Sequence, residues 1–154
     1  PYALVWDDEN YYLIAYDHTA SPPGIRHYRV DRMENLRVLE APRAGKALLG
    51  EMDMAQYVQR TFGMFGGEQQ NVELRFASRL AGVVLDRFGK ETILLPHGED
   101  SFRVHVQAVV SPQFMGWLSG FGPDAQLLGP PGAVRDYVAF CRAALAQYEE
   151  PRGV

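Results

Sequence analysis

The hydrophobic pattern of this chain of 154 residues changes rhythm part-way along, and the change limits the folds it can adopt. Up to about residue 39, short apolar and aromatic runs are separated by polar turns. From about residue 70, such runs alternate with stretches of helical spacing. Strands joined by tight turns curl into barrels or sandwiches, whereas alternating strands and helices form a sheet covered by helices. The sequence therefore predicts a mixed α+β chain made of two differently built parts.

The first part is predicted to be a small β-barrel or curled sheet. Its apolar and aromatic runs predict strands at residues 3–6, 11–16, 26–30 and 36–39. Turns rich in aspartate, asparagine, proline and glycine separate these runs. Because almost no helical spacing occurs among them, the strands must close on one another to bury their apolar sides.

A connecting segment follows, in which Asp53 is placed to cap a helix that runs to about residue 62 and ends at Gly63. The glycine-rich stretch 66–70 is predicted to be a hinge. We therefore divide the chain into a barrel at residues 1–50, a connecting helix and hinge at residues 51–69, and a C-terminal domain at residues 70–154.

The C-terminal part has the spacing of a βαββαβ arrangement followed by one more helix. Strands are predicted at residues 72–76, 92–95, 102–110 and 125–128, with helices after Ser78, after Ser111 and at residues 133–148. Ser78 is placed to cap its helix, and Pro112 suits a first helical position. This order of elements predicts a ferredoxin-like fold.

Composition excludes several classes of protein. With 47% apolar and 22% charged residues, the chain is of globular type. Its apolar runs are too short to cross a bilayer, and the acidic residues 7–9 interrupt the place where a signal peptide would be apolar. The single cysteine, Cys141, excludes an intramolecular disulfide, and its place on an apolar helical stripe predicts an inert buried thiol. A cytoplasmic protein is expected.

No enzyme chemistry is predicted. The histidines at positions 18, 27, 97 and 105 show no metal-ligand spacing with one another or with a pair of acidic residues. The chain also has no glycine-rich phosphate loop and no nucleophile elbow. We therefore predict no catalytic residue, no metal and no cofactor.

Two short motifs resemble the WYL domain of bacterial transcription regulators. The Tyr-Tyr-Leu triplet at residues 11–13 stands where that family has Trp-Tyr-Leu. Residues 26–33 match the family's second signature, through Arg26, Tyr28, Arg29, Val30, Asp31, Arg32 and Met33. The second half resembles the extension that often follows WYL domains, so the resemblance covers essentially the whole chain.

The resemblance implies an Sm-like or SH3-like barrel followed by a ferredoxin-like dimerisation or extension domain. It also implies a winged helix-turn-helix DNA-binding domain upstream, and a barrel that senses pieces of nucleic acid or nucleotide-like ligands. The chain starts inside a predicted strand without an initiating methionine. We therefore expect a fragment whose barrel is incomplete at its N-terminus or is completed by another copy.

The arginine-rich stretch 26–32 is the best candidate for a ligand site. Because a barrel core is apolar and strand side chains alternate, Tyr28 and Val30 are expected to face inward and Arg29 outward. Arg26 and Arg32 lie near the strand ends and can reach round at the rim. Three guanidinium groups with Tyr28 interleaved suit phosphate pairing and base stacking, so Arg26, Tyr28, Arg29 and Arg32 are assigned to the site.

A structural role for these arginines is the alternative. Arg29 or Arg32 can form an ion pair with Asp31 or Glu34, which would leave no charge for a ligand. On the neighbouring strand, Tyr16 and His18 are assigned to the site, whereas Tyr12 is expected in the core.

Two functions therefore remain open. The first is a sensor that binds single-stranded nucleic acid or a nucleotide-like anion and passes the signal to the DNA-binding helices of a homodimer. Because the net charge is −4, such binding needs a local basic patch. The second is an assembly platform that dimerises the regulator and has no ligand. A metabolite pocket in the ferredoxin-like half rests on fold analogy alone.

Overall fold

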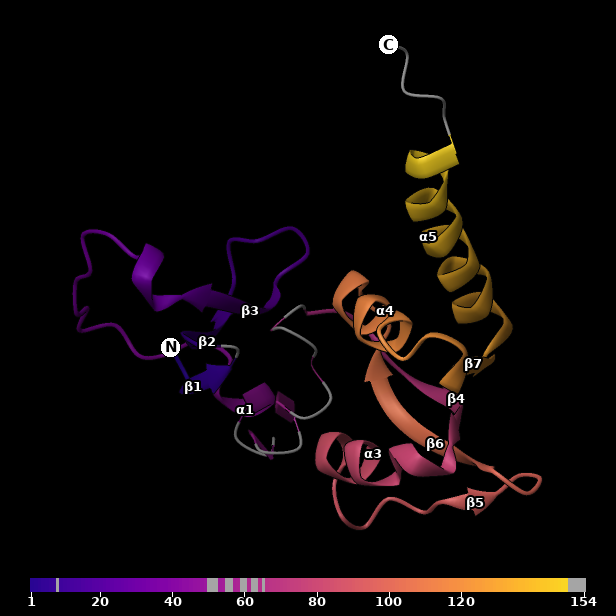
Figure 1. The fold of residues 1–154 in the computed structure, drawn as a ribbon. Helices are drawn as coiled ribbons and strands as arrows, with labels where there is room; N and C mark the ends of the chain where they lie inside the picture. The colour runs from indigo at the N-terminus through magenta and orange to yellow at the C-terminus, as the bar shows by residue number, and fades with distance from the viewer. Residues whose placement is uncertain are drawn as a thin grey trace. The chain divides into compact units, whose positions relative to one another are not determined.

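The computed structural model describes residues 1–7, 9–49, 53, 54, 57, 58, 61, 64 and 66–149, with only the backbone described at residues 48 and 49. The chain divides into two compact units, Pro1–Gly66 and Gly67–Val154, and each unit is described by itself (Figure 1). Both units contain an antiparallel sheet, one of three strands and one of four. The mixed α+β class predicted from the sequence is confirmed.

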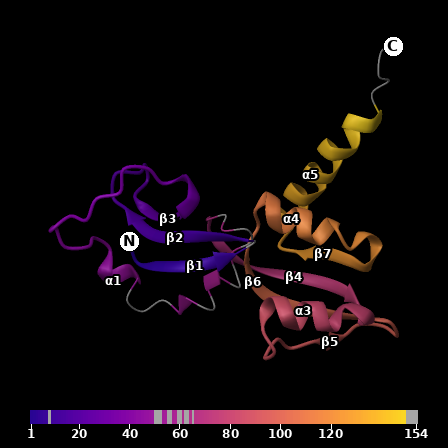
Figure 2. The ribbon, with the colours of Figure 1, turned by 60° about the vertical axis from the view of Figure 1, so that its left-hand side comes forward.

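The first unit is built on an antiparallel sheet in the order β1-β2-β3 (Figure 2). Its strands are β1 (Ala3–Asp7), β2 (Asn10–Asp17) and β3 (Gly24–Arg29). A 3-10 turn, Val30–Arg32, follows β3, and a short helix α1 covers Lys46–Leu49. The first three predicted strands are therefore confirmed, with β3 ending one residue earlier than expected.

The fourth predicted strand, at residues 36–39, is wrong. This stretch has no regular structure, and Leu36, Val38 and Leu39 are all exposed. An extended segment becomes a strand only when its N–H and C=O groups find a partner. Among the described residues β3 is the last strand of the sheet, and nothing pairs with this stretch. A closed barrel remains a prediction.

The two faces of the first sheet differ in what covers them. Ile14 is fully buried, and its direct cross-strand neighbours are Ala3 and His27. Opposite residues in an antiparallel pair point to the same face, so His27 lies on this covered face. Tyr28 lies on the other face and is 39% exposed. The expectation that Tyr28 and Val30 face a core is therefore wrong. The buried Ile14 places His27, and not Tyr28, on the covered face. Val30 already belongs to the 3-10 turn.

The segment before the unit boundary supplies the rest of this small core. Thr61 and Met64 are buried, and positions 54, 57 and 58 are helical. The N–H of Tyr57 donates to the carbonyl of Asp53, which is a bond of helical spacing. The helix predicted after Asp53 is thus seen where the structure describes this segment. Its remaining positions and its predicted end at Gly63 lie outside the described residues.

The second unit alternates strands and helices in the predicted order. Its strands β5, β6, β4 and β7 are neighbours in that order, and every pairing is antiparallel. Its elements are β4 (Gln69–Ala77), α3 (Ala81–Phe88), β5 (Leu95–Pro96), β6 (Ser101–Val109), α4 (Pro112–Ser119), β7 (Ala125–Gly129) and α5 (Pro131–Glu149).

One helix of the second unit begins as its sequence indicates and another does not. Ser111 caps α4, since its Oγ accepts the N–H of Phe114, and Pro112 takes the first helical position. Ser78 does not cap α3. It instead opens a 3-10 turn, Ser78–Leu80, and its N–H donates to the carbonyl of Asp100. The 3-10 turn therefore moves the start of α3 to Ala81, beyond the reach of a Ser78 cap.

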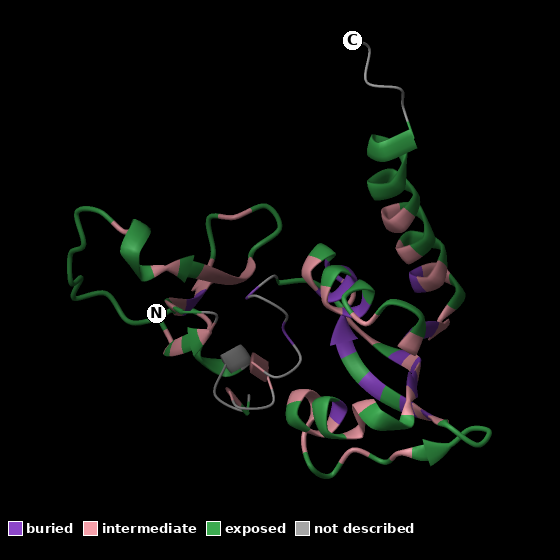
Figure 3. Ribbon diagram, viewed as in Figure 1, coloured by how far each residue is buried: buried purple, intermediate pink, exposed green. Residues whose placement is uncertain are grey.

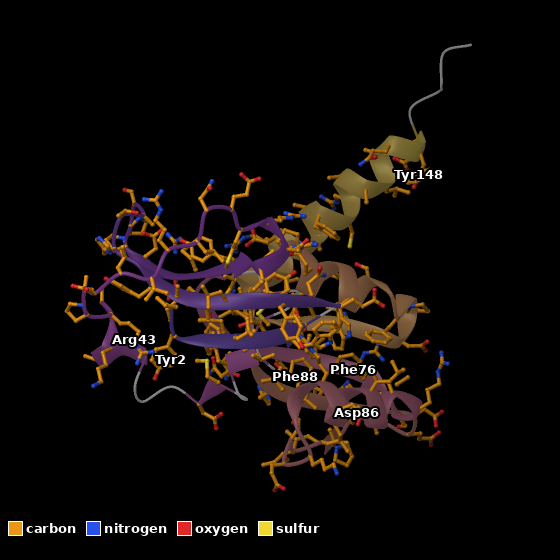
Figure 4. All side chains as sticks on the ribbon, turned by 90° about the vertical axis from the view of Figure 1, so that its left-hand side faces the viewer. Tyr2, Arg43, Phe76, Asp86, Phe88 and Tyr148 are labelled. Atoms are coloured by element: carbon orange, nitrogen blue, oxygen red, sulfur yellow. The ribbon has the colours of Figure 1, made fainter. Side chains whose placement is uncertain are left out.

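The core of the second unit lies between one face of the sheet and the helices α3 and α4. Val72, Leu74 and Phe76 alternate along β4 and are fully buried, as their spacing predicts (Figure 3). The Phe76 ring lies about 6 Å from the rings of Phe102, Trp117 and Phe121. Figure 4 labels Phe76, which belongs to β4, and Phe88, the last residue of α3.

Helix α5 is exposed along most of its length. Ala133 near its start is buried, while Leu145 and Tyr148 near its end are 54% and 81% exposed. Figures 3 and 4 show the later turns extending beyond the sheet, with Tyr148 far out on the helix. Cys141 is half-buried, so the expectation of a buried thiol is met only in part.

Removal of the Phe76 side chain should strongly destabilise the second unit. A fully buried phenylalanine cut to alanine costs about 3–5 kcal/mol through lost burial and the cavity left behind. We expect Phe76→Ala to lower the free energy of unfolding in urea by that amount. Ile93→Ala is the matched control, because Ile93 is 74% exposed and should change it by less than about 0.5 kcal/mol. Equal effects would contradict the assigned core.

Candidate ligand-binding surface

The uncovered face of the first sheet, which we call the outer face, carries large exposed rings. Trp6, Tyr11 and Tyr28 are 58%, 52% and 39% exposed. Trp6 lies directly across from Tyr11, with ring centroids 4.7 Å apart in an edge-to-face arrangement. Leu13 lies between Leu4 and Tyr28 in the next row. The outer face is therefore apolar and aromatic, and it is open to solvent at these rings, whereas Ala15 on the same face is buried.

Trp6 and Tyr11 were not predicted as site residues. The signal was available in part, because the acidic turn after Trp6 indicates a hairpin that places the two rings opposite each other. The sequence could not show which face of the sheet would be covered. Only the burial of Ile14 decides that Tyr11, and not Tyr12, belongs to the exposed row.

Arg26 and Tyr28 share the outer face, two residues apart on β3. The guanidinium of Arg26 donates to the carbonyls of Ile25 (3.0 Å) and Pro22 (2.9 Å). Both acceptors are neutral, so the positive charge of Arg26 stays available. The Tyr28 hydroxyl donates to Asp17 at 2.8 Å, which raises the pKa of Tyr28.

Asp17 closes the β2–β3 turn. Its Oδ1 accepts the N–H and the hydroxyl of Thr19 and the N–H of Ala20. These hydrogen bonds, with that of Tyr28, hold the pKa of the Asp17 carboxyl far below its usual range. Asp17 therefore stays ionised and keeps the Tyr28 ring in place at the edge of the outer face.

Arg29 is engaged in an ion pair. Its Nε and Nη2 donate to the two carboxylate oxygens of Asp31 at 3.0 and 2.8 Å. This bidentate contact raises the pKa of Arg29 and lowers that of Asp31. Arg29 also lies on the same face as His27. The structural ion pair considered for Arg29 is thus what the fold contains, and the expected outward, unpaired Arg29 is wrong.

The other predicted site residues are distributed over both faces and ends of the sheet. Tyr16 lies on the covered face and is close to the backbone of Gly45, where an added Cβ would come within 2.6 Å of it. His18 follows the end of β2 and is exposed. Arg32 follows β3 beyond Arg29, is exposed, and makes no hydrogen bond within the described part of the chain. The six predicted residues therefore do not form one cluster.

His27 holds the covered face to the connecting segment. Its Nδ1 contacts the carbonyl of Met64, and its Nε2 lies 2.7 Å from the hydroxyl of Tyr57. A neutral ring satisfies both partners when Nδ1–H donates to Met64 and Nε2 accepts the Tyr57 proton. Burial lowers the pKa of His27, against the opposing effect of the Met64 carbonyl, and raises that of Tyr57. Both side chains are therefore neutral near pH 7.

Comparison with protein families identifies a WYL domain at residues 1–38 and a WCX domain at residues 68–145. The WCX match alone covers half of the chain. The chain belongs to the family of proteins in which a WYL domain is followed by a WCX domain. The family inferred from the tyrosine triplet and the arginine motif is thus confirmed.

Among solved structures, the chain is similar to the proteasome accessory factor B/C (PafBC) of Arthrobacter aurescens, with 25% sequence identity and a TM-score of 0.44. The match covers 96% of this chain and 22% of the PafBC chain, so the chain spans about a fifth of that protein's length. Comparison with curated proteins gives no match. No helix within the described ranges is long and apolar enough to cross a membrane.

The first unit should lose stability as the pH falls below about 6.5, the ordinary pKa of histidine. The folded state lowers the pKa of His27, so the unfolded state binds a proton first. The free energy of unfolding should therefore be highest above pH 6.5 and fall by up to about 1.4 kcal/mol per pH unit below it. Urea unfolding followed by Trp6 fluorescence, with Trp117→Phe in every protein, measures this loss.

His27→Gln is the matched variant, because it removes the titrating ring and leaves the other three histidines unchanged. Its unfolding free energy should depend less on pH between 5 and 7 than that of the parent, by up to about 1.4 kcal/mol per pH unit. The same pH dependence in both proteins would contradict a buried neutral His27.

Proposed function

We propose that this chain is the ligand-sensing region of its WYL-family regulator and that it binds single-stranded nucleic acid or a nucleotide-like anion on the outer face. The observation that carries the proposal is the three exposed rings, Trp6, Tyr11 and Tyr28, in two neighbouring rows of one sheet face that also bears Arg26. Exposed aromatic rings on a sheet are the usual stacking platform for unpaired bases.

Base stacking and arginine–phosphate contacts can together account for ligand binding on the outer face. Stacking of a base on an aromatic ring contributes about 1–3 kcal/mol. Arg26 and Arg32 lie toward opposite ends of β3 and can each meet a phosphate, whereas Arg29 must first leave Asp31. Because the net charge of the chain is −4, a polyanion can bind only where positive charge is concentrated locally, as at these arginines. His18 and Tyr16 have weaker support, because Tyr16 lies on the covered face.

The proposal extends to the regulator as a whole. The family implies DNA as the final partner, through an upstream winged helix, and a bacterial cytoplasm as the location. We propose a binding role and no catalysis, metal or cofactor. The strand order β5-β6-β4-β7 supports a ferredoxin-like second domain, and a complete barrel in the first would need further strands. The division at residues 1–50, 51–69 and 70–154 belongs to the same proposal.

Trp6→Ala should weaken the binding of a fluorescein-labelled oligothymidylate by about 5- to 150-fold, the equivalent of one lost stacking contact. Fluorescence anisotropy at low salt measures the affinity. Ile93→Ala is the control, because it removes an apolar side chain that is 74% exposed and lies neither on the outer face nor on α5. Arg32→Gln should lessen the slope of log K against log salt by about 0.7, the value for one phosphate contact on a single strand.

Arg29→Gln should cost less affinity than Arg32→Gln, because the Arg29 guanidinium is already bound to Asp31. A titration with cyclic dinucleotides in place of the oligonucleotide distinguishes a nucleotide ligand from a single strand. Equal affinities of Trp6→Ala and Ile93→Ala, or no binding by the parent protein at low salt, would contradict the proposal.

A second function, dimerisation, is favoured by α5. Val138, Leu145 and Tyr148 are exposed on this helix, and with Val134 and Cys141 they follow the three- and four-residue spacing of a helix–helix seam. Two copies of such a stripe are self-complementary about a two-fold axis. We therefore propose that α5 pairs with α5 of a second copy in a homodimer.

Leu145→Glu should disrupt this homodimer, because it places a buried charge in the seam. Sedimentation velocity should show a dimer for the parent protein and a shift toward monomer for the variant, with at least about tenfold weaker association. Gln147→Glu adds the same charge to a position off the seam and should remain dimeric. A monomeric parent, or equal dissociation of the two variants, would exclude α5 as the interface.

A further inference from the structure

The four-stranded sheet of the second unit has a polar face opposite the one that packs on α3 and α4. Because strand side chains alternate, the residues between Val72, Leu74 and Phe76 lie on this face, which we call the polar face. It is at least partly exposed, as the alternating burial colours along β6 show in Figure 3. Its central members are Glu73, Arg75, Arg103, His105 and Gln126.

Two arginines meet at the centre of the polar face. Arg75 on β4 is the direct cross-strand partner of Arg103 on β6. Side chains in this relation have Cβ atoms about 5 Å apart, and like charges placed so repel each other. Negative charge near both guanidinium groups would remove this repulsion.

The protein supplies that charge to only one of them. Arg103 Nη1 donates to Glu73 Oε1 at 3.0 Å. Arg75 donates to the side-chain oxygen of Gln126 at 3.2 Å and to the carbonyl of Pro123 at 3.4 Å, and both acceptors are neutral. In the part of the chain that the structure describes, Arg75 has no carboxylate partner.

The neighbouring charged residues do not neutralise the positive charge of Arg75. Asp124, next to Pro123, is already paired with Arg79. His105 Nε2 lies 4.0 Å from the same Glu73 oxygen that Arg103 binds. Arg103 also has an Nε–H that is shielded from solvent and has no hydrogen-bond partner among the described residues. A buried donor without an acceptor costs about 1–3 kcal/mol, so an added oxygen acceptor would be favoured here.

We propose that Arg75 and Arg103 form a binding site for a phosphate group on the polar face of the second sheet. A tetrahedral phosphate can offer one pair of oxygens to each guanidinium, and a carboxylate offers only one pair in total. The phosphate would neutralise Arg75, relieve its repulsion from Arg103, and compete with Glu73 for Arg103. The site is separate from the proposed nucleic-acid site on the outer face, because it lies in the second unit and uses none of the residues of the outer face.

The experiment titrates the whole chain with inorganic phosphate at constant ionic strength and follows the arginine Nε–Hε signals by NMR. Saturable shifts of Arg75 and Arg103 are expected, with smaller shifts for acetate at the same concentration. Arg75→Gln should weaken phosphate binding at least about tenfold, since it removes charge-assisted hydrogen bonds. Glu73→Gln should strengthen it, because the competing carboxylate is gone.

Arg135→Gln is the matched control, because it removes one exposed arginine from α5 and should leave the phosphate affinity unchanged. Thymidine 5′-monophosphate in a parallel titration distinguishes a phosphomonoester from free phosphate as the source of the group. Equal affinities for Arg75→Gln and Arg135→Gln, no gain for Glu73→Gln, or equal binding of acetate would each overturn the proposal. Trp6→Ala should not affect this titration, so failure of the oligonucleotide site is distinguishable from failure of this one.

Discussion

The buried Ile14 and the hydrogen bonds of His27, which lies opposite it, together mark the covered face of the first sheet. His27 sits on β3 opposite the buried Ile14, and its ring joins the sheet to Tyr57 and to the carbonyl of Met64. The connecting segment is thereby fastened to one face. Tyr28, the next residue along β3, must then point to the other face, where Trp6 and Tyr11 also lie. The aromatic rings therefore lie on the face opposite this contact and the buried Ile14.

Much of the architecture follows from residue patterns. The alternation of Val72, Leu74 and Phe76 predicts a half-buried strand, and Ser111 with Pro112 marks the start of α4, because these signals act within a few residues. The predicted strand at residues 36–39 failed because a strand also needs a partner, which no local pattern supplies. Ser78 failed as a cap because a 3-10 turn, Ser78–Leu80, comes between it and the start of α3 at Ala81.

The candidate site was predicted in its residue types and not in its geometry. Arg26 and Tyr28 share a face as the period of two requires. The sequence could not tell which face would be covered, so Trp6 and Tyr11 were missed and Tyr28 was placed in the core. It also left two roles open for Arg29, and the bidentate contact with Asp31 is the structural one. Long-range packing decides these choices, and it is not encoded in strand spacing.

The central claim is that unpaired bases stack on the outer face, and Trp6 can report on it directly. The chain has two tryptophans, and Trp117 lies in the aromatic core of the second unit. In a Trp117→Phe protein, titration with oligothymidylate should quench the Trp6 fluorescence in a saturable way, with the same midpoint as anisotropy of the labelled oligonucleotide. Saturating binding by anisotropy with no change in Trp6 emission would contradict the account.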